Sequence, residues 1–298
     1  MAMHLPSRLG RLRYLFAAAF IALAGVTVAT SAEQAEPGTT TRTLYASIVD
    51  TAGQPVLNLG AADVQVRENG VLRPVEIEPA TEPLRVALIV SQIARHDRLL
   101  ESARALCNAL DGSAEISVIS VIGDAEVLSG FSSRSADCLA ALNRVEQKQG
   151  FGSHMDPALV EGILKTSSTI SREGWRSAIV VLREGAERPT PLYGDRLREP
   201  IRASGDVLYV ASTRGAADQL TQPLGLAMST IVDGAIESGG RHVMLGFEAS
   251  VMQQLASEIA TRYRIRYLAA AHPSEDARIS VSTLRPGARI LAPTRISH

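Results

Sequence analysis

Three residue types that serve in nucleophilic catalysis stand close together at Ser153, His154 and Asp156. A catalytic base must lie in line with its nucleophile, and that geometry is usually assembled from distant loops rather than from neighbouring residues. The sequence contains no Gly-x-Ser-x-Gly elbow, no His-Glu-x-x-His motif and no Gly-x-x-x-x-Gly-Lys phosphate loop. Asp156 precedes Pro157, a pair typical of a helix start. We therefore expect a protein that is not an enzyme, with a hydrolase using Ser153 as the alternative.

The other chemically active side chains are dispersed along the chain. The six histidines show no metal-ligand spacing, and we expect each to be a surface residue or a loop cap. Arg262, Arg264 and Arg266 alternate in a pattern that suits an anion site or, as we prefer, the solvated side of a helix-to-strand junction.

A net charge of −1 and an aromatic content of 4% provide neither the basic surface nor the stacking platform typical of nucleic-acid binding.

Two cysteines, Cys107 and Cys138, fall in segments that we expect to be helical. In an oxidising compartment they could form a disulfide, which would stabilise the fold by about 3 kcal/mol or more. The alternative is a pair of buried thiols that never meet. Without a neighbouring histidine, two cysteines do not make a zinc site.

The N-terminal segment has the pattern of an export signal. Arg8, Arg11 and Arg13 precede an uncharged run over 14–29, and small residues follow up to Ala32. This order predicts a signal peptide over 1–32 and a protein that is periplasmic or secreted. The alternative is an uncleaved anchor, but the run is shorter than the roughly 20 residues that span a bilayer. We expect no stable membrane insertion after cleavage, and a mildly acidic mature chain.

The rest of the sequence divides into β and α/β segments. A polar leader over 33–42 precedes a β block over 43–82, in which Asn69-Gly70 predicts a hairpin between strands at 64–68 and 71–77. Buried strands then alternate with helices, which indicates a mostly parallel sheet covered on both faces. The predicted strands are 84–90, 116–122, 126–128, 178–182 and 207–211, and the predicted helices are 97–110, 135–146, 156–170, 224–237 and 249–262.

The closing strands complete the predicted organisation. We expect 264–268 to end the sheet of an α/β domain over 83–271. The C-terminal segment 272–298 carries an alternating strand at 279–283, which we expect to pair with the opening block. One small β module would then be built from both ends of the chain, and the alternative is two separate hairpins.

The order of several motifs resembles bacterial VWFA-related exported proteins, which combine a short β module with a von Willebrand factor type A domain. The motifs are DTAGQPV at 50–56, LGAADVQVRENG at 59–70, the strands 86–90 and 179–182, SGGR at 238–241, LASEIATRYRIRY at 255–267 and VSTLRPG at 281–287. The resemblance covers almost all of 43–292 and implies a doubly wound, mostly parallel sheet.

The resemblance also implies where a divalent metal would bind. The family places Asp-x-Ser-x-Ser after the first buried strand, but this sequence has Ser91, Ile93 and Arg95 at those positions. Ser153 stands where the family has a threonine, and Glu184 where it has a late aspartate. Too few oxygen donors remain, and nearby arginines oppose a cation. We expect a degenerate site with no cofactor, and a non-standard Mg²⁺ site is the alternative.

The predicted function is therefore that of an exported, non-enzymatic protein–protein interaction module. Its partner would be another exported or envelope protein, and not a nucleic acid. We expect the partner to contact Arg95, His96, Ser153, His154, Arg183 and Glu184.

Overall fold

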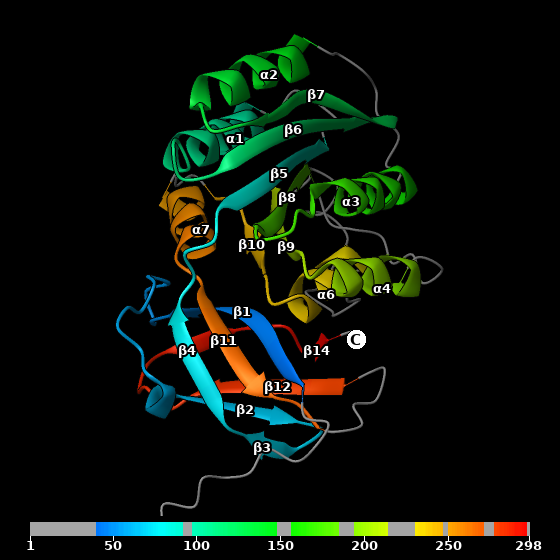
Figure 1. The fold of residues 1–298 in the computed structure, drawn as a ribbon. Coiled ribbons are helices and arrows are strands. Elements are labelled where there is room, and N and C mark those ends of the chain that lie inside the picture. Colours follow the sequence, from blue (N-terminus) through cyan, green and yellow to red (C-terminus); the bar gives the residue numbers. More distant parts are fainter. Residues whose placement is uncertain are drawn as a thin grey trace, which may run out of the picture. The chain divides into compact units, whose positions relative to one another are not determined.

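The computed structural model describes residues 40–91, 97–147, 156–184, 194–213, 230–246, 250–270 and 277–296. Within these residues the chain forms an α/β domain and a β module (Figure 1). Among the helices of this part of the chain, none has the length and apolar character needed to cross a membrane.

The centre of the α/β domain is a six-stranded sheet in the order β10-β9-β8-β5-β6-β7. All neighbouring pairs are parallel except β6 and β7, which are antiparallel. This arrangement confirms the doubly wound, mostly parallel sheet that the sequence predicts. The strands are β5 (Leu84–Ser91), β6 (Glu115–Ile122), β7 (Asp124–Ser132), β8 (Arg176–Glu184), β9 (Val207–Thr213) and β10 (His242–Met244).

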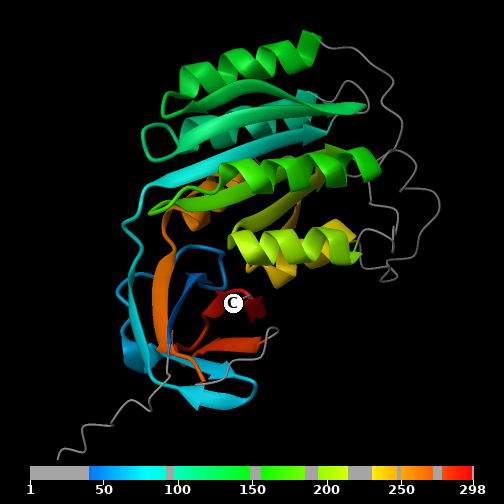
Figure 2. The ribbon, with the colours of Figure 1, turned by 45° about the vertical axis from the view of Figure 1, so that its right-hand side comes forward.

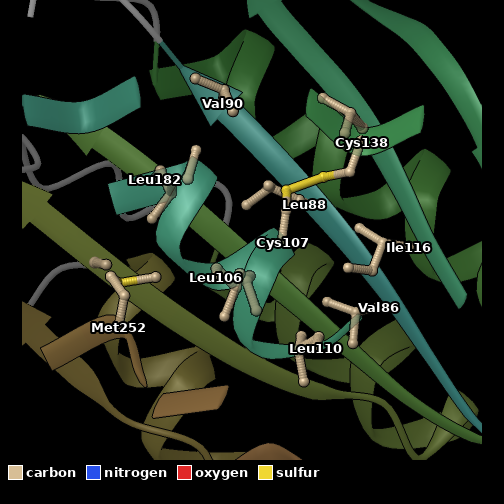
Figure 3. Close-up of a cluster of buried hydrophobic side chains, with 14 of the residues drawn as sticks. Val86, Leu88, Val90, Leu106, Cys107, Leu110, Ile116, Cys138, Leu182 and Met252 are labelled. Atoms are coloured by element: carbon tan, nitrogen blue, oxygen red, sulfur yellow. A yellow bond between two sulfur atoms is a disulfide. The ribbon is translucent and has the colours of Figure 1, made fainter. Parts of the chain in front are cut away.

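Helices cover both faces of this sheet (Figure 2). Alternate residues of each central strand point to opposite faces, so the strands contribute to two separate apolar clusters. One cluster includes Leu88 and Leu182 with side chains from α1, α2 and α7 (Figure 3), and the other includes Ile89 and Val181 with side chains from α3, α4 and α6. The helices are α1 (Asp97–Ala109), α2 (Ser135–Gln147), α3 (Asp156–Ile170), α4 (Gly194–Ser204), α6 (Thr230–Glu237) and α7 (Ser250–Ala260).

The β module consists of two four-stranded sheets, in the orders β13-β1-β11-β4 and β14-β12-β2-β3. N-terminal β1 pairs with β13, and N-terminal β2 pairs with C-terminal β12, so both ends of the chain build one module as expected. The elements are β1 (Thr41–Val49), η1 (Ala61–Asp63), β2 (Val64–Glu68), β3 (Val71–Arg73), β4 (Val75–Pro79), β11 (Tyr263–Leu268), β12 (Ala277–Thr283), β13 (Arg289–Leu291) and β14 (Arg295–Ile296).

Two details of the module bear on the sequence predictions. Asn69 and Gly70 have φ values of 50° and 84°, as a two-residue hairpin between β2 and β3 requires. The expectation that 264–268 ends the central sheet is wrong, because β11 pairs with β1 and β4 inside the module. A strand with alternating buried and half-buried residues suits an open antiparallel sheet better than a parallel sheet buried on both faces.

Gly239 and Gly240 allow two close backbone approaches, the first to the C-terminal segment of the module and the second to β9 of the α/β domain. Gly239 has a φ of +81°, and a Cβ added there would lie 2.6 Å from the carbonyl carbon of Ala292. A Cβ on Gly240 would lie 2.0 Å from the carbonyl oxygen of Leu208. Ser238 bridges to Pro293 alongside them. Only glycine therefore allows these backbones to approach so closely.

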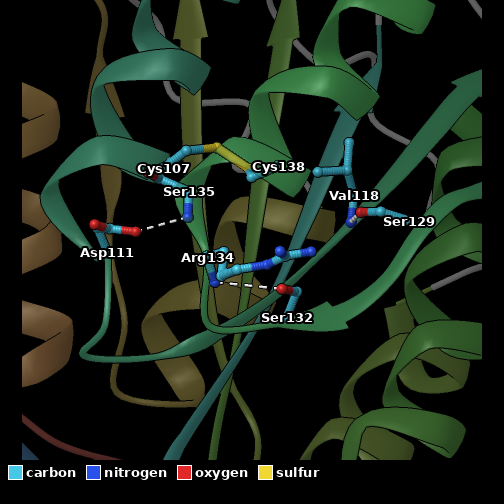
Figure 4. The surroundings of a disulfide bond; sticks show 8 residues. All are labelled: Cys107, Asp111, Val118, Ser129, Ser132, Arg134, Ser135 and Cys138. Atoms are coloured by element: carbon cyan, nitrogen blue, oxygen red, sulfur yellow. Dashed lines mark hydrogen bonds between the residues drawn. A yellow bond between two sulfur atoms is a disulfide. The ribbon is translucent and has the colours of Figure 1, made fainter.

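The structure joins Cys107 of α1 to Cys138 of α2 by a disulfide, with their Cα atoms 6.1 Å apart (Figure 4). Both cysteines are buried against the central sheet. Asp111, in the turn that follows α1, accepts a hydrogen bond of 2.7 Å from the backbone N–H of Ser135, the first residue of α2. The helices are thus fixed to one another across a separation of 31 residues.

Candidate functional site

The topology of the central sheet favours a binding site at one place along its carboxyl edge. After β5 the chain continues to β6 on one side, and after β8 it continues to β9 on the other side. Ligands of doubly wound sheets bind where this reversal opens a crevice beyond the carboxyl ends of the strands. The point of reversal lies between Ser91, the last residue of β5, and Arg183 of β8.

Register and side-chain alternation define which groups share a face at this edge. Arg183 pairs with Ser91 on one side and with Ser212 of β9 on the other, so these three side chains point to the face covered by α3, α4 and α6. Glu184 pairs with Thr213, and by the same alternation both point to the opposite face. The edge thus presents a guanidinium between two hydroxyls on one face, and a carboxylate beside a hydroxyl on the other.

A serine–histidine contact extends this edge toward β10. The Oγ atom of Ser212 and the Nε2 atom of His242 are 2.7 Å apart. Burial lowers the pKa of His242, and the positive charge of Arg183 lowers it further. His242 is therefore a neutral hydrogen-bonding group near neutral pH. Ser212 is itself buried, with 4% of its surface exposed.

His242 and Ser212 are site residues that the sequence interpretation missed. The expectation that every histidine is a surface residue or a loop cap is wrong for His242, which is half-buried in a short strand. The signal for Ser212 was present, since this residue directly follows the predicted strand 207–211. The signal for His242 was weak, because a strand of three residues has too few positions to show a periodicity.

The structure describes only part of the predicted residue set. It brings Ser91, Arg183 and Glu184 to one edge of the sheet. The other predicted positions, Ile93, Arg95, His96, Ser153 and His154, lie outside the described residues.

The described part of this edge fits a divalent metal poorly. By strand alternation, Ser91 and Glu184 point to opposite faces of the sheet. Arg183 is 7% exposed and places a positive charge beside Ser91. Among the described residues, no three His, Cys, Asp or Glu side chains form a group that could hold a metal ion.

Comparison with known proteins gave matches only among solved structures. No protein-family model matches the chain, and no curated protein matches it. The BatB protein of Bacteroides thetaiotaomicron is 16% identical over 59% of this chain and 97% of that chain, with a TM-score of 0.44. A von Willebrand factor type A protein of Catenulispora acidiphila is 9% identical over 88% of this chain and 75% of that chain, with a TM-score of 0.45.

A third match is proximal thread matrix protein 1 from the mussel byssus, described with a zinc-occupied MIDAS motif. It is 11% identical over 66% of this chain and 50% of that chain, with a TM-score of 0.47. Because all three scores lie below 0.5, the assignment of the fold rests on the strand order and helix placement of this chain itself.

Proposed function

We propose that this chain is an exported protein–protein interaction module of von Willebrand type A-like fold, which binds another exported or envelope protein without a bridging metal. The binding surface is the carboxyl edge of the central sheet, around Ser91, Arg183 and Glu184, together with Arg95, His96, Ser153 and His154. The protein is not an enzyme, and its localisation is periplasmic or extracellular.

One observation supports this proposal more than any other: Arg183 lies between Ser91 and Ser212 at the reversal point of the sheet. In a metal-dependent site of this fold class, a cation would bridge the domain to a carboxylate of the partner. A guanidinium can bind a partner carboxylate directly, through charge-assisted hydrogen bonds of fixed geometry. Arg183 is 7% exposed, so a partner carboxylate that enters the crevice at the reversal point would meet its positive charge without a bridging metal.

A calorimetric titration with Mg²⁺ and Mn²⁺ tests metal independence. We expect no saturable heat from either ion at millimolar concentrations. Micromolar binding of either ion would contradict the proposal and favour the alternative, a metal-dependent adhesion domain with a non-standard site.

Crosslinking in the native cell envelope tests the binding surface. Glu184→Lys reverses a charge at the proposed surface, and Glu101→Lys makes the same change on an exposed face of α1. We expect Glu184→Lys to abolish capture of a specific partner, and we expect Glu101→Lys and added chelator to leave that capture unchanged. Equal capture by both variants would overturn the assignment of the surface.

The alternative of an exported hydrolase is tested separately. In the described residues the closest approach to a catalytic pair is Ser212 with His242. A panel of esters and peptides should show no turnover above background. Turnover that is lost in Ser153→Ala or Ser212→Ala would identify an enzyme instead.

A further inference from the structure

A cavity of about 190 Å³ lies at the amino ends of β8 and β9, at the edge of the central sheet opposite to the proposed interaction surface. Its wall includes residues of β1 and β14 from the module and residues of β8, α4 and α6 from the α/β domain. An apolar cavity of about 150 Å³ is large enough to hold benzene. The cavity therefore has room for a ligand with one six-membered ring and one small polar group.

Two buried arginines give this cavity a cationic wall. Arg262 is 5% exposed and Arg176 is 8% exposed, and both line the cavity. Arg262 donates from Nη2 to the carbonyl oxygen of Tyr45 at 2.5 Å, while its buried Nε atom has no hydrogen-bond partner in the described part of the chain. Arg176 donates to the carbonyl oxygens of Glu82, Ile259 and Ala260 at 3.1–3.4 Å. The expectation that Arg262 lies on a solvated face is thus wrong.

Neither arginine forms a salt bridge with a carboxylate of the described residues. Glu82 lies near Arg176 but pairs with Arg264, and Glu258 lies near Arg262 but pairs with Arg241 at 2.8 Å. Burial lowers the pKa of Arg176, and the neighbouring charge of Arg262 lowers it further. Glu82 and Glu258 are each shared with a second arginine, so an anion bound between these guanidiniums would reduce the remaining cost of burying two positive charges.

The rest of the cavity wall consists of a buried carboxylate and apolar side chains. Asp206 is buried in the cavity wall, and its carboxylate accepts hydrogen bonds from Ser167 and Ser204 at 2.7 Å and from Ser177. These hydroxyls supply the hydrogen bonds to the Asp206 carboxylate, so Asp206 does not depend on Arg176 or Arg262 for them. Trp175, Ile201 and Ile296 provide apolar surface to the same cavity.

We propose that this cavity binds a small monocarboxylate with a single-ring apolar body. The carboxylate would lie against the guanidiniums of Arg262 and Arg176, and the ring would pack against Trp175 and Ile201. The Nε atom of Arg262 has no partner among the described residues and is available to donate to a carboxylate, whereas Arg176 already donates to backbone carbonyls and contributes mainly its positive charge. A charge-assisted hydrogen bond of this kind explains the preference over a neutral group of the same size.

Trp175 is the only tryptophan of the chain, so its fluorescence reports on this cavity directly. Cyclohexanecarboxylate is a suitable probe because it does not absorb at the wavelength that excites tryptophan. Cyclohexanecarboxamide is the uncharged control with the same ring. We expect saturable changes in fluorescence and in calorimetric heat, with the carboxylate binding at least tenfold more tightly than the amide. Equal affinity for the two probes, or no binding of the carboxylate, would overturn the proposal.

Two variants locate the binding. Arg262→Met should reduce the affinity for the carboxylate at least tenfold and remove its advantage over the amide. Arg104→Met removes a half-buried arginine of α1 that pairs with Glu146 outside the cavity, and this control should bind as the unchanged protein does. Ile296→Phe fills the cavity from a half-exposed position, and it should abolish binding even if Arg262→Met fails to fold. Unchanged binding in folded Ile296→Phe would place the ligand elsewhere.

Discussion

At the scale of single residues, the electrostatics of the carboxyl edge are measurable through His242. Burial is the larger cause of its lowered pKa, and the charge of Arg183 is the second. We expect an NMR titration to place the midpoint of His242 below its ordinary value of 6.5. Arg183→Gln should raise that midpoint only part of the way, because burial persists. The same change at exposed Arg172, near the amino end of β8, should leave it unmoved.

The lowered pKa of His242 also determines how stability depends on pH. As the pH falls below 6.5, the unfolded state binds a proton that the folded state still resists, so the free energy of unfolding falls. Urea denaturation between pH 7 and pH 5 should show this decrease. His242→Gln should show a smaller decrease over the same range, and an identical decrease would mean that His242 titrates normally in the folded protein.

The close backbone approach at Gly240 leads to a second prediction for a single residue. Gly240→Ala must move either the added methyl group or the carbonyl of Leu208, since the two would be 2.0 Å apart. We expect a loss of about 3 kcal/mol or more in the free energy of unfolding. Gly130→Ala is the matched control, because a Cβ at Gly130 meets nothing within 4 Å, and it should change stability by less than about 1 kcal/mol. Equal effects would show that the contact is not tight.

At the scale of elements, the disulfide should be a main source of stability for α1 and α2. It closes a sequence separation of 31 residues, for which loop entropy predicts about 3 kcal/mol or more. Reductant should lower the free energy of unfolding by that amount. The double variant Cys107→Ala/Cys138→Ala should be less stable from the start and insensitive to reductant. A variant as stable as the oxidised protein would contradict this estimate.

Local sequence patterns predicted most elements but not all of their partners. Apolar runs such as 84–90 and 178–182 predicted buried parallel strands, because such strands need no polar alternation. Helix α4 was missed because Arg196, Arg198 and Pro200 obscure the spacing of its buried Leu197 and Ile201. The expected strand at 126–128 covers only part of β7 (Asp124–Ser132), so most of β7 was missed. The sheet to which β11 belongs depends on hydrogen bonds to β1 and β4, more than 180 residues away.

The candidate site was predictable to a smaller extent than the fold. The ends of the predicted strands located Ser91, Arg183 and Glu184 at one edge, because carboxyl ends of parallel strands meet there. Alternation along one strand already places the consecutive residues Arg183 and Glu184 on opposite faces, but the alignment of Ser91 with Arg183 depends on a register that no local pattern reveals. The cationic cavity was harder still, since Arg176 and Arg262 are far apart in sequence, and burial of an arginine is a property of the assembled structure.

At the scale of the whole molecule, the module should depend on both ends of the chain. β12 supplies the hydrogen-bonded partner of β2, and Thr294 donates from its backbone N–H to the carbonyl oxygen of Glu237 in α6 at 3.0 Å. A chain without residues 277–298 loses both contacts and leaves β2 with only the three-residue strand β3. Two strands with little apolar cover are marginal in water.

We therefore expect this truncation to unfold the second sheet of the module while the central sheet persists. Hydrogen exchange should show loss of protection for the amides of β2, relative to the full chain. The amides of β5 and β8 serve as an internal control, because their partners all lie in the α/β domain, and they should stay protected. Loss of protection in β5 and β8 would show that the two parts fold as a single cooperative unit. Retained protection in β2 would show that β12 is not needed to hold the module together.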